Sequence, residues 1–456
     1  MTIIASNSVS PGERSASYWL VVAGFGIVTL SVVGFVRLQY AMPSEFSSPL
    51  GLNVPGVGFY TRQLVGPGGP MSTLAPREFS TWFRSLLSLA WVAYMVALVA
   101  GLIGKRLPSM SCLLLWIVTV SFLVAIWCPP SLSNDVHAYV AFGRMLTFHE
   151  RNPYTTSPAE LSLQGDPTQN YLSYLQIPNV YGPVWMLGTT AVLRVLNGVG
   201  VWWTIVFLKL LAGTSLVAAA VCGRALVEAR NPGRGDLVLA AIGFNPLLIV
   251  EGPGNGHNDI LMMALLLGAT VLQQRGRMLL GDLVLGLSIG IKFLPILVLP
   301  WVAFGRMRGR RPWDALRAAT LSTVLILTPM ILSFLPFWEG AATFSGVEQR
   351  LRWGQSPDLS PGLAASIIRA MGQWPTLVAY LGLSGWVALR EDVNRRLDAW
   401  TLMAMVLIVW TMGVAFPWYL SWILIASMSS CTRVGIAASV IGLIWAAKAT
   451  VVDYCG

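Results

Sequence analysis

Long apolar runs alternate with short polar connections along most of the chain, and this alternation predicts a bundle of transmembrane helices. A helix needs about 20 apolar residues to cross a ~30 Å hydrocarbon layer. Helices satisfy their own backbone hydrogen bonds inside lipid, where no water is present to do so. The predicted crossings are 18–36, 85–104, 112–128, 202–221, 236–251, 260–272, 318–334, 377–389 and 399–415, followed by two apolar runs flanking Arg433.

Two apolar stretches do not fit a simple crossing. Residues 183–197 are short for a span, and we interpret them as a half-inserted or surface-lying helix. One crossing by 282–305 would carry the arginines within 306–311 to the wrong side of the membrane. Glycines and a proline interrupt this second stretch. We therefore predict a re-entrant helical hairpin with its tip near Lys292, because broken helices at membrane depth are tolerated where they line a cavity.

Composition agrees with the membrane interpretation. Hydrophobic residues make up 55% of the chain and charged residues 11%, against about 25% charged in soluble domains, and the mean hydropathy is +0.66. The net charge of +10 is explained by arginines in connections that set orientation and meet anionic lipid. The sequence thus favours a single membrane domain, residues 1–456, whose partner is the bilayer and not a nucleic acid.

The positions of the arginines predict an orientation. The positive-inside bias puts the N-terminus and the arginine-rich connections in the cytoplasm. The segments 37–84, 129–182 and 335–374 then become outer loops, and Cys455 lies outside. The outer loop 129–182 carries the densest group of reactive side chains, so candidate chemistry is expected at the outer face.

Asp135 is the main candidate in that loop. It follows Asn134 and precedes a segment, 136–147, that reads as helical. Either residue could serve as an N-cap, since Asn and Asp side chains accept bonds from the first backbone N–H groups of a helix. If Asn134 caps the helix, the carboxylate of Asp135 is free. An ionisable group at a membrane boundary is a functional candidate, because its desolvation is costly.

Two further polar or aromatic segments leave alternatives open. His257 and Asp259 lie within the glycine-rich stretch 254–259, which is either a hydrogen-bonded turn or part of a site. In neither polar loop are potential metal ligands spaced as they are in known metal sites. The aromatic segment 416–422 is either an interfacial belt or a surface that stacks on a sugar or an isoprenoid.

Taken in order along residues 80–430, these segments resemble bacterial polyprenol-phosphate-mannose-dependent mannosyltransferases, and among them the actinobacterial α-1,6-mannosyltransferases of lipoglycan assembly. The matching segments are Asn134-Asp135-Val136-His137-Ala138-Tyr139, Asn152-Pro153-Tyr154, Tyr181-Gly182-Pro183-Val184-Trp185, Asn245-Pro246, residues 254–259, Lys292 and residues 416–420. The resemblance implies a GT-C-like bundle of about 11–13 transmembrane or re-entrant helices with outer-face catalytic loops. His137 departs from the family, whose members usually have Tyr there, and many members are longer, which leaves the acceptor and the sugar open.

The resemblance also implies a reaction at the outer face of the cytoplasmic membrane. Mannose would pass from a polyprenyl-phosphate donor to a hydroxyl of a glycolipid or lipoglycan acceptor, with Asp135 as the base. A phosphate leaves as a stabilised anion, so one carboxylate suffices for an inverting displacement and no acid is needed at the leaving oxygen. We expect Arg144, His257 and Lys292 to bind the donor phosphate. The expected substrate-binding residues are Asn134, His137, Tyr139, Tyr154, Tyr181, Asn258, Asp259, Trp418 and Tyr419. No cofactor is required, although Mg or Mn is compatible with this chemistry.

Two other classes of protein share some of these features. A lipid-sugar flippase or secondary transporter would also have broken helices and intramembrane charges, but it places them near the bilayer midplane between repeats. The polar groups here gather in loops at one predicted face, which favours surface chemistry. A structural subunit would not require a free carboxylate at position 135.

Overall fold

Among the residues that the computed structural model describes, six helices are long and apolar enough to cross a membrane. They are α1 (Pro11–Gln39), α3 (Pro76–Gly104), α4 (Met110–Trp127), α7 (Val201–Glu228), α13 (Pro312–Phe334) and α19 (Arg433–Lys448), the last in continuation with η9 (Ala449–Asp453). The structure describes residues 11–41, 75–104, 106–161, 166, 168, 176–354, 371–389, 392–411, 416–430 and 432–453. No β-strand occurs among these residues, so the prediction of an all-α polytopic membrane protein is confirmed.

Shorter helices fill the space between the long ones. The α-helices are α5 (Asp135–Phe148), α6 (Pro183–Val195), α8 (Gly235–Gly243), α9 (Pro246–Ile249), α10 (Asp259–Gln274), α11 (Met278–Ile291), α12 (Leu299–Met307), α14 (Ser345–Gly354), α16 (Trp374–Leu389), α17 (Val393–Val406) and α18 (Leu420–Met428). The 3-10 helices are η3 (Leu294–Val298), η4 (Leu335–Phe337), η5 (Ala342–Phe344) and η8 (Pro417–Tyr419), and the π-helices are η2 (Val250–Gly254), η7 (Leu407–Thr411) and η9 (Ala449–Asp453).

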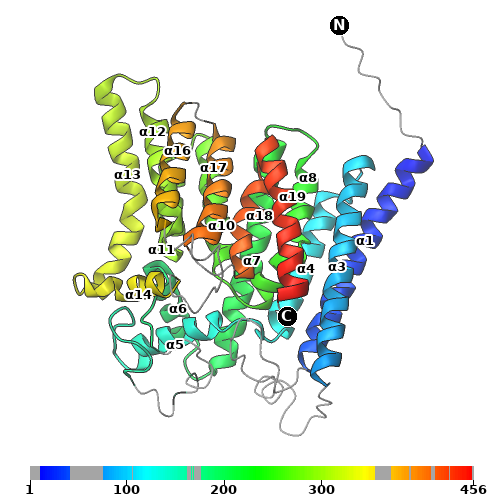
Figure 1. Cartoon of the computed structure of the whole chain (residues 1–456), viewed down its shortest axis with the longest axis horizontal. Coiled ribbons are helices and arrows are strands. Elements are labelled where there is room, and N and C mark those ends of the chain that lie inside the picture. The colour runs from blue at the N-terminus through cyan, green and yellow to red at the C-terminus, as the bar shows by residue number, and fades with distance from the viewer. Residues whose placement is uncertain are drawn as a thin grey trace.

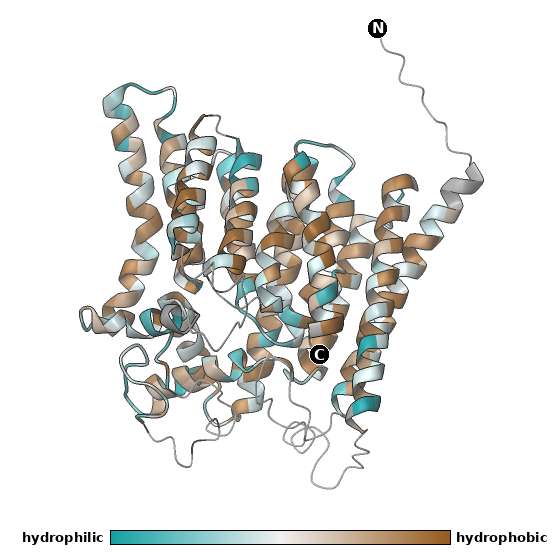
Figure 2. Ribbon diagram, viewed as in Figure 1, coloured by the Kyte–Doolittle hydropathy of each residue, from teal (hydrophilic) through white to brown (hydrophobic). Residues whose placement is uncertain are grey.

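The two ends of the bundle differ in their chemistry. The connections α7–α8 and α12–α13 lie at the upper end in Figure 1, whereas α5, α6 and α14 lie at the lower end. Arginines occupy the upper connections, which contain Arg230, Arg234, Arg308, Arg310 and Arg311. Figure 2 shows the apolar stretches of the helices between these more polar ends. The helix α1 begins at the upper end and η9 ends lower down (Figure 1), while Cys455 lies outside the described residues.

Short helices form hairpins that stop inside the bundle. In the first hairpin, α8 and the segment Pro246–Gly254 meet at a 53° bend. Asn245 is extended there and its side chain accepts a bond from Leu248 N at 3.2 Å, and Pro246 cannot continue the preceding helix because it has no N–H. The following helix, α10, turns back. The tip of this hairpin is the polar stretch between Glu251 and Asp259.

The second hairpin has its break where the sequence predicts one, at Lys292. Its entry into and exit from the membrane on the same side stay a prediction. Helix α11 ends at Lys292, whose backbone is extended (φ −151°, ψ 133°), and Pro295 and Pro300 begin the short helices that follow. With 14 and nine residues, α11 and α12 are shorter than the about 20 residues that a crossing requires. Both pack along α13. Lys292 therefore lies at the tip, inside the protein.

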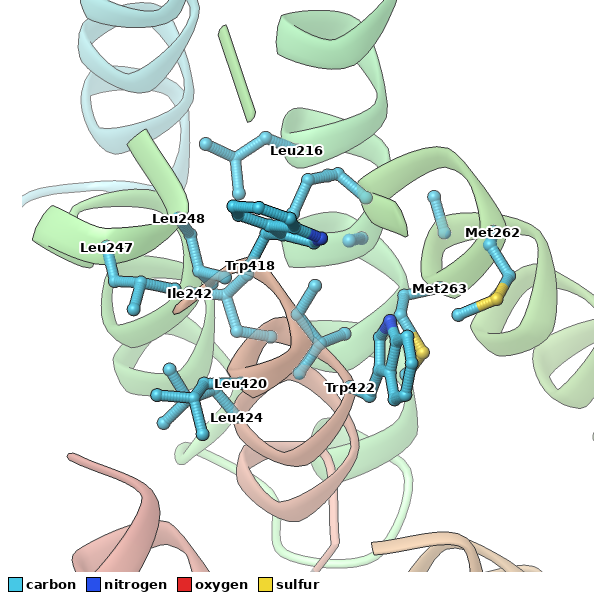
Figure 3. Close-up of a cluster of buried hydrophobic side chains, with 14 of the residues drawn as sticks. Leu216, Ile242, Leu247, Leu248, Met262, Met263, Trp418, Leu420, Trp422 and Leu424 are labelled. Atoms are coloured by element: carbon cyan, nitrogen blue, oxygen red, sulfur yellow. The ribbon is translucent and has the colours of Figure 1, made fainter. Parts of the chain in front are cut away.

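The third hairpin is formed by α17 with η7 on one side and η8 with α18 on the other. The start of its second arm, residues 416–422, packs in the apolar core. Figure 3 shows Trp418 beside Leu216 of α7, and Trp422 beside Met262 and Met263 of α10, with Leu420 and Leu424 on the other side of the same helix. Both tryptophans are almost completely buried. Because their rings are fixed by packing, the neighbouring Tyr419 is held in one place.

The structure changes two details of the predicted layout and agrees with a third. The predicted outer loop 37–84 is too long, because α3 begins at Pro76, where proline is suited to the first helical turn, and Phe79 and Phe83 are buried. The stretch 254–259 is not exposed at a surface; His257 and Asp259 are fully buried, where they form ion pairs. Residues 183–195 do form a separate short helix, α6, at the lower end. The predicted loops 129–182 and 335–374 lie partly outside the described residues.

Candidate active site

Asp135 is the first residue of α5 and does not cap the helix. Asn134 occupies the N-cap position without a side-chain capping bond, and the backbone N–H of Asp135 instead donates to Ser133 Oγ at 3.2 Å. The carboxylate of Asp135 lies 3.3 Å from His257 Nδ1 and accepts a hydrogen bond from the Tyr181 hydroxyl. The alternative in which Asp135 only caps a helix is therefore wrong.

His257 lies between two carboxylates and is completely buried. Its Nδ1 faces Asp135, and its Nε2 lies 3.2 Å from Glu251 Oε2. Burial alone would lower the pKa of His257, but the hydrogen bonds and charges of Asp135 and Glu251 raise it to about 9. Burial would likewise raise the pKa of Asp135, yet the bond and charge of His257, with a contribution from Lys292, lower it below its usual value. At neutral pH the base candidate is thus a carboxylate beside an imidazolium.

Lys292 forms a second ion pair next to the first. Its Nζ donates to Asp259 Oδ1 at 2.8 Å and lies 5.3 Å from the ring centroid of Tyr419 and 5.5 Å from that of Trp422. Asp259 Oδ1 also accepts a bond from Trp422 Nε1 at 2.6 Å. His257 and Asp259 therefore have different partners, although they are two residues apart in sequence.

One cavity is lined by the tip of the second hairpin, the segment 416–422, α5 and α14. Its volume is about 370 Å³, within the size range of small-molecule sites. One part of the wall is polar and contains Asn134, Asp135, Tyr181, Lys292 and Arg350. The rest is mainly apolar and is formed by Ala138, Phe142, Pro158, Ile177, Pro178, Val180, Phe293, Leu294, Ile296, Leu297, Val347, Leu407, Phe416, Trp418, Tyr419 and Trp422. The shape of this lining suits a ligand with a charged head and a long apolar tail.

The aromatic side chains at the cavity are packed against one another. Trp418 is stacked with His257 at a centroid distance of 4.3 Å and with Phe416 at 4.5 Å. Tyr419 is stacked with Trp422 at 4.6 Å. Only 4% of Trp418 and 7% of Tyr419 is exposed. The segment 416–422 is therefore part of the protein core at the cavity wall rather than an interfacial belt.

Tyr139 and Asn258 support the site from behind the cavity. The Tyr139 hydroxyl donates to Asn258 Oδ1 at 3.2 Å, and the Tyr139 ring makes edge contacts with Tyr181 and Trp185. These contacts tie α5 to the tip of the first hairpin. Substrate contact by Tyr139 or Asn258 stays a prediction, since neither side chain lines the cavity.

Three other predicted site residues lie away from the cavity. Arg144 Nε forms an ion pair with Asp166 at 3.0 Å, and the Tyr154 hydroxyl donates to the carbonyl oxygen of Tyr181 at 2.7 Å. His137 is buried, and burial together with the charge of Lys209 lowers its pKa to about 3. The structure gives these residues structural contacts, and their predicted substrate roles stay untested.

Sequence reasoning missed two charged residues of the site. Glu251 lies in an apolar run and carries no local motif, although its position in a π-helix, a form often found at functional sites, marks it in the structure. Arg350 on α14 lines the cavity, and its guanidinium lies 5.9 Å from the centroid of Phe416. An intramembrane carboxylate such as Glu251 is the signal that could have been used.

No arrangement of three or more His, Cys, Asp or Glu side chains suited to a metal ion occurs among the described residues. Both ring nitrogens of His257 face carboxylates at 3.2–3.3 Å, so this cluster is held together by its own charges. The site as described brings together a carboxylate, an imidazolium and two cations around an amphipathic cavity.

Comparison with known proteins gives a consistent result. The family described as alpha-(1->6)-mannopyranosyltransferase, N-terminal domain, matches residues 79–308, which include Asp135, His257 and Lys292. The alpha-(1->6)-mannopyranosyltransferase A of Mycobacterium tuberculosis is 27% identical over 369 residues, covering 70% of this chain and 67% of the relative. A probable alpha-(1->6)-mannopyranosyltransferase of Mycolicibacterium smegmatis is 24% identical over 438 residues, covering 78% of this chain and 71% of the relative.

A third relative covers a smaller part. The alpha-(1->6)-mannopyranosyltransferase A of Corynebacterium glutamicum is 27% identical over 183 residues, which are 39% of this chain and 36% of the relative. No solved structure matches the chain.

Proposed function

Because the chain belongs to the alpha-(1->6)-mannopyranosyltransferase family, we propose that it transfers mannose from a polyprenyl-phosphate donor to a hydroxyl of a glycolipid or lipoglycan acceptor. The observation that carries the choice of donor is the cavity. Charged and polar side chains at Asp135, Lys292 and Arg350 adjoin a wall of aliphatic and aromatic groups. A nucleotide-sugar would leave this apolar wall without a partner, whereas an isoprenoid chain would cover it.

The proposed reaction is a single inverting displacement. The acceptor hydroxyl oxygen attacks C1 of the sugar while its proton passes to Asp135, and the C1–O bond breaks with its electron pair leaving on the lipid phosphate. Positioned base catalysis of this kind is typically worth a factor on the order of 100 to 10,000. The charge on the departing phosphate is stabilised by Lys292 and Arg350, both of which line the cavity.

The positions of His257 and Arg144 argue for a revised assignment of the phosphate ligands. Neither side chain lines the cavity, whereas Lys292 and Arg350 do. We therefore assign the donor phosphate to Lys292 and Arg350. Because these cations neutralise the phosphate, the proposed step requires no metal, and activity that persists in a strong chelator is the expected result.

We place this chemistry on the outer face of the cytoplasmic membrane. Support comes from the arginines in the upper connections, since basic connections favour the cytoplasmic side. The cavity wall is built in part from α5 and α14, which lie at the opposite end of the bundle (Figure 1). A lipid donor and a lipid-anchored acceptor would both reach this end from the outer leaflet.

Transfer by the purified protein in vesicles tests the proposal. Labelled polyprenyl-phosphate mannose and GDP-mannose are offered in parallel with a glycolipid acceptor, and the linkage in the product is determined. We expect α-1,6-linked mannose from the lipid donor and none from the nucleotide donor. Transfer from GDP-mannose alone would contradict the choice of donor, and movement of the labelled lipid across the bilayer without transfer would identify a flippase instead.

A further inference from the structure

Glu251 is a buried carboxylate for which the proposed reaction has no direct use. It is fully buried at the tip of the first hairpin and does not line the cavity. Its Oε2 lies 3.2 Å from His257 Nε2 and accepts a bond from Asn255 Nδ2 at 3.2 Å. A buried carboxylate is costly unless it is paired, so its place behind His257 calls for a physical reason.

The geometry restricts the protonation state of His257. A neutral imidazole carries one N–H, and its second nitrogen presents a lone pair. In this structure each ring nitrogen lies at ion-pair distance from a carboxylate oxygen, Nδ1 at 3.3 Å from Asp135 and Nε2 at 3.2 Å from Glu251. A neutral ring would place a lone pair against one of these anions unless that carboxyl were protonated. An imidazolium satisfies both contacts, because both of its nitrogens are donors.

We propose that Glu251 is a positioning residue that keeps His257 as an imidazolium, so that His257 holds Asp135 as an oriented carboxylate facing the cavity. The inference rests on the proposed function, in which Asp135 is the base. Glu251 acts through His257 and does not touch substrate.

The ring of His257 is fixed as well as charged. It is stacked on Trp418, at an interplanar angle of 17°, and Trp418 is held by the packed core (Figure 3). The backbone contributes too, because the N–H of His257 donates to the carbonyl oxygen of Glu251 at 3.1 Å. The imidazolium therefore cannot turn away from Asp135 without disrupting this packing.

Other titratable groups surround the triad formed by Asp135, His257 and Glu251. Lys292, Tyr139, Tyr181 and Tyr419 interact with Asp135, and Lys209 lies behind Gly256. Neutralising Glu251 leaves the ion pair of Lys292 with Asp259 in place, so Asp135 keeps one neighbouring cation. The test must therefore detect the loss of the other cation beside Asp135, the imidazolium of His257.

Histidine NMR provides a readout that needs no substrate. The chain contains three histidines, so ¹⁵N-histidine labelling gives few signals, and His137→Gln and His149→Gln assign them. At pH 7.5 we expect both nitrogens of His257 to be protonated in the unaltered protein. In Glu251→Gln we expect a neutral ring, because the amide donates to Nε2 in place of the lost anion. A neutral His257 in the unaltered protein would overturn the proposal.

Kinetics show whether the charge matters for transfer. Glu251→Gln should reduce kcat by about 10- to 100-fold, the usual cost of removing a group behind a catalytic ligand, while KM for polyprenyl-phosphate mannose stays unchanged. The acid limb of the kcat profile should move to higher pH, because Asp135 loses a neighbouring cation. Glu251→Asp, which keeps the charge, should recover part of kcat. An unchanged kcat and pH profile in Glu251→Gln would overturn the proposal.

Asp282→Asn is the matched control. Asp282 is also a fully buried carboxylate with a cation beside it, Arg306 at 2.8 Å, and it does not line the cavity. The Asp282→Asn substitution should lower thermal stability without altering the NMR signals of His257 or the pH profile of kcat. If NMR shows the imidazolium but no sugar transfer occurs with any donor, His257 is charged as proposed and it is the proposed reaction that fails.

Discussion

Asp135 and Asp282 are both buried carboxylates next to a basic side chain, yet their surroundings differ. Asp282 has its bonds complete: Oδ1 accepts from Gln273 and Arg306 at 2.8 Å, and Oδ2 accepts from Ser322 at 2.6 Å. Asp282 does not line the void beside its partner Gln273, and that void measures only about 10 Å³. Asp135 adjoins a cavity of about 370 Å³. Burial of a charge therefore does not by itself indicate function, since a fully bonded carboxylate in a closed space stabilises the fold.

The second polar cluster shows what such a closed arrangement does. Asp282 on α11 connects α10 through Gln273, α12 through Arg306 and α13 through Ser322. Gln273 is in turn bonded by Arg396 of α17 at 2.9 Å. These bonds clamp the hairpins together away from their tips. The side chains that line the cavity are thereby held in fixed positions, as catalysis requires.

The largest expected effect is that of Asp135→Asn. The amide is nearly isosteric with the carboxylate but cannot take a proton from the acceptor. We expect transfer to slow by at least about a hundredfold, with expression, membrane insertion and donor binding unchanged. Initial rates with polyprenyl-phosphate mannose and a thermal unfolding scan provide the check. Near-normal transfer by a well-folded variant would remove Asp135 from the mechanism and direct attention to Asp259.

A smaller effect is expected for Lys292→Met, which removes the cation at the second tip. A hydrogen bond to a charged group contributes about 1.5–3 kcal/mol, so the KM for the lipid donor should rise about 10- to 100-fold. The acceptor KM is the internal control and should change little. Lys292→Arg, which keeps a cation beside Asp259, should lose less. If neither KM changes, Lys292 serves only to pair with Asp259.

Asp282→Asn should leave chemistry intact and lower stability. Breaking a buried ion pair costs about 3–5 kcal/mol, because the partner, here Arg306, is left uncompensated. Thermal unfolding in detergent measures this loss, and the rate per folded molecule should stay at the level of the unaltered protein. The contrary outcome is a lower rate per folded molecule together with a shifted pH profile of transfer. That outcome would mean that Asp135 and Asp282 are coupled, and the comparison between them would fail.

The pH dependence of transfer sharpens the same comparison. The pKa of Asp135 is lowered, so the carboxylate persists at and below its usual titration range, and the pKa of His257 is raised to about 9. Because its pKa is raised, His257 keeps its charge at neutral pH and loses it as the pH rises through about 9. We expect kcat to be flat from pH 6 to pH 8 and to fall above that. An inflection near pH 6.5 would show that His257 titrates normally.

The hairpin at Lys292 could be predicted from sequence because two independent patterns agree. The arginines after residue 305 exclude a crossing, and the glycines and Pro295 in the preceding run mark a break. Helix α11 does end at Lys292. Asp135 could be singled out for a similar reason, because a carboxylate between a predicted span and a polar loop is unusual in so apolar a chain.

The partners of these residues could not be predicted, because they are set by packing between distant segments. Glu251 follows an apolar run that looks like any buried helix, and its role becomes visible only when the first hairpin meets α5. His257 and Asp259 are close in sequence, but α10 begins at Asp259, so its side chain turns toward Lys292. Arg350 belongs to α14, whose first residue, Ser345, donates to the carbonyl oxygen of the distant Tyr154 at 3.2 Å.

The smallest expected effect concerns Arg144 and Arg350, for which the sequence and the structure favour different assignments of the donor phosphate. The sequence predicts that Arg144 binds the donor phosphate, but its Nε is engaged by Asp166 at 3.0 Å and its guanidinium lies 4.7 Å from the Phe148 ring centroid. Arg350 lines the cavity. Arg144→Gln should leave the donor KM unchanged and cost at most about 1 kcal/mol of stability, as for other partly exposed ion pairs, whereas Arg350→Gln should raise the donor KM. Donor titrations of both variants in the same vesicles decide between the two arginines. A raised donor KM in Arg144→Gln alone would identify Arg144 as the phosphate ligand, as the sequence predicts.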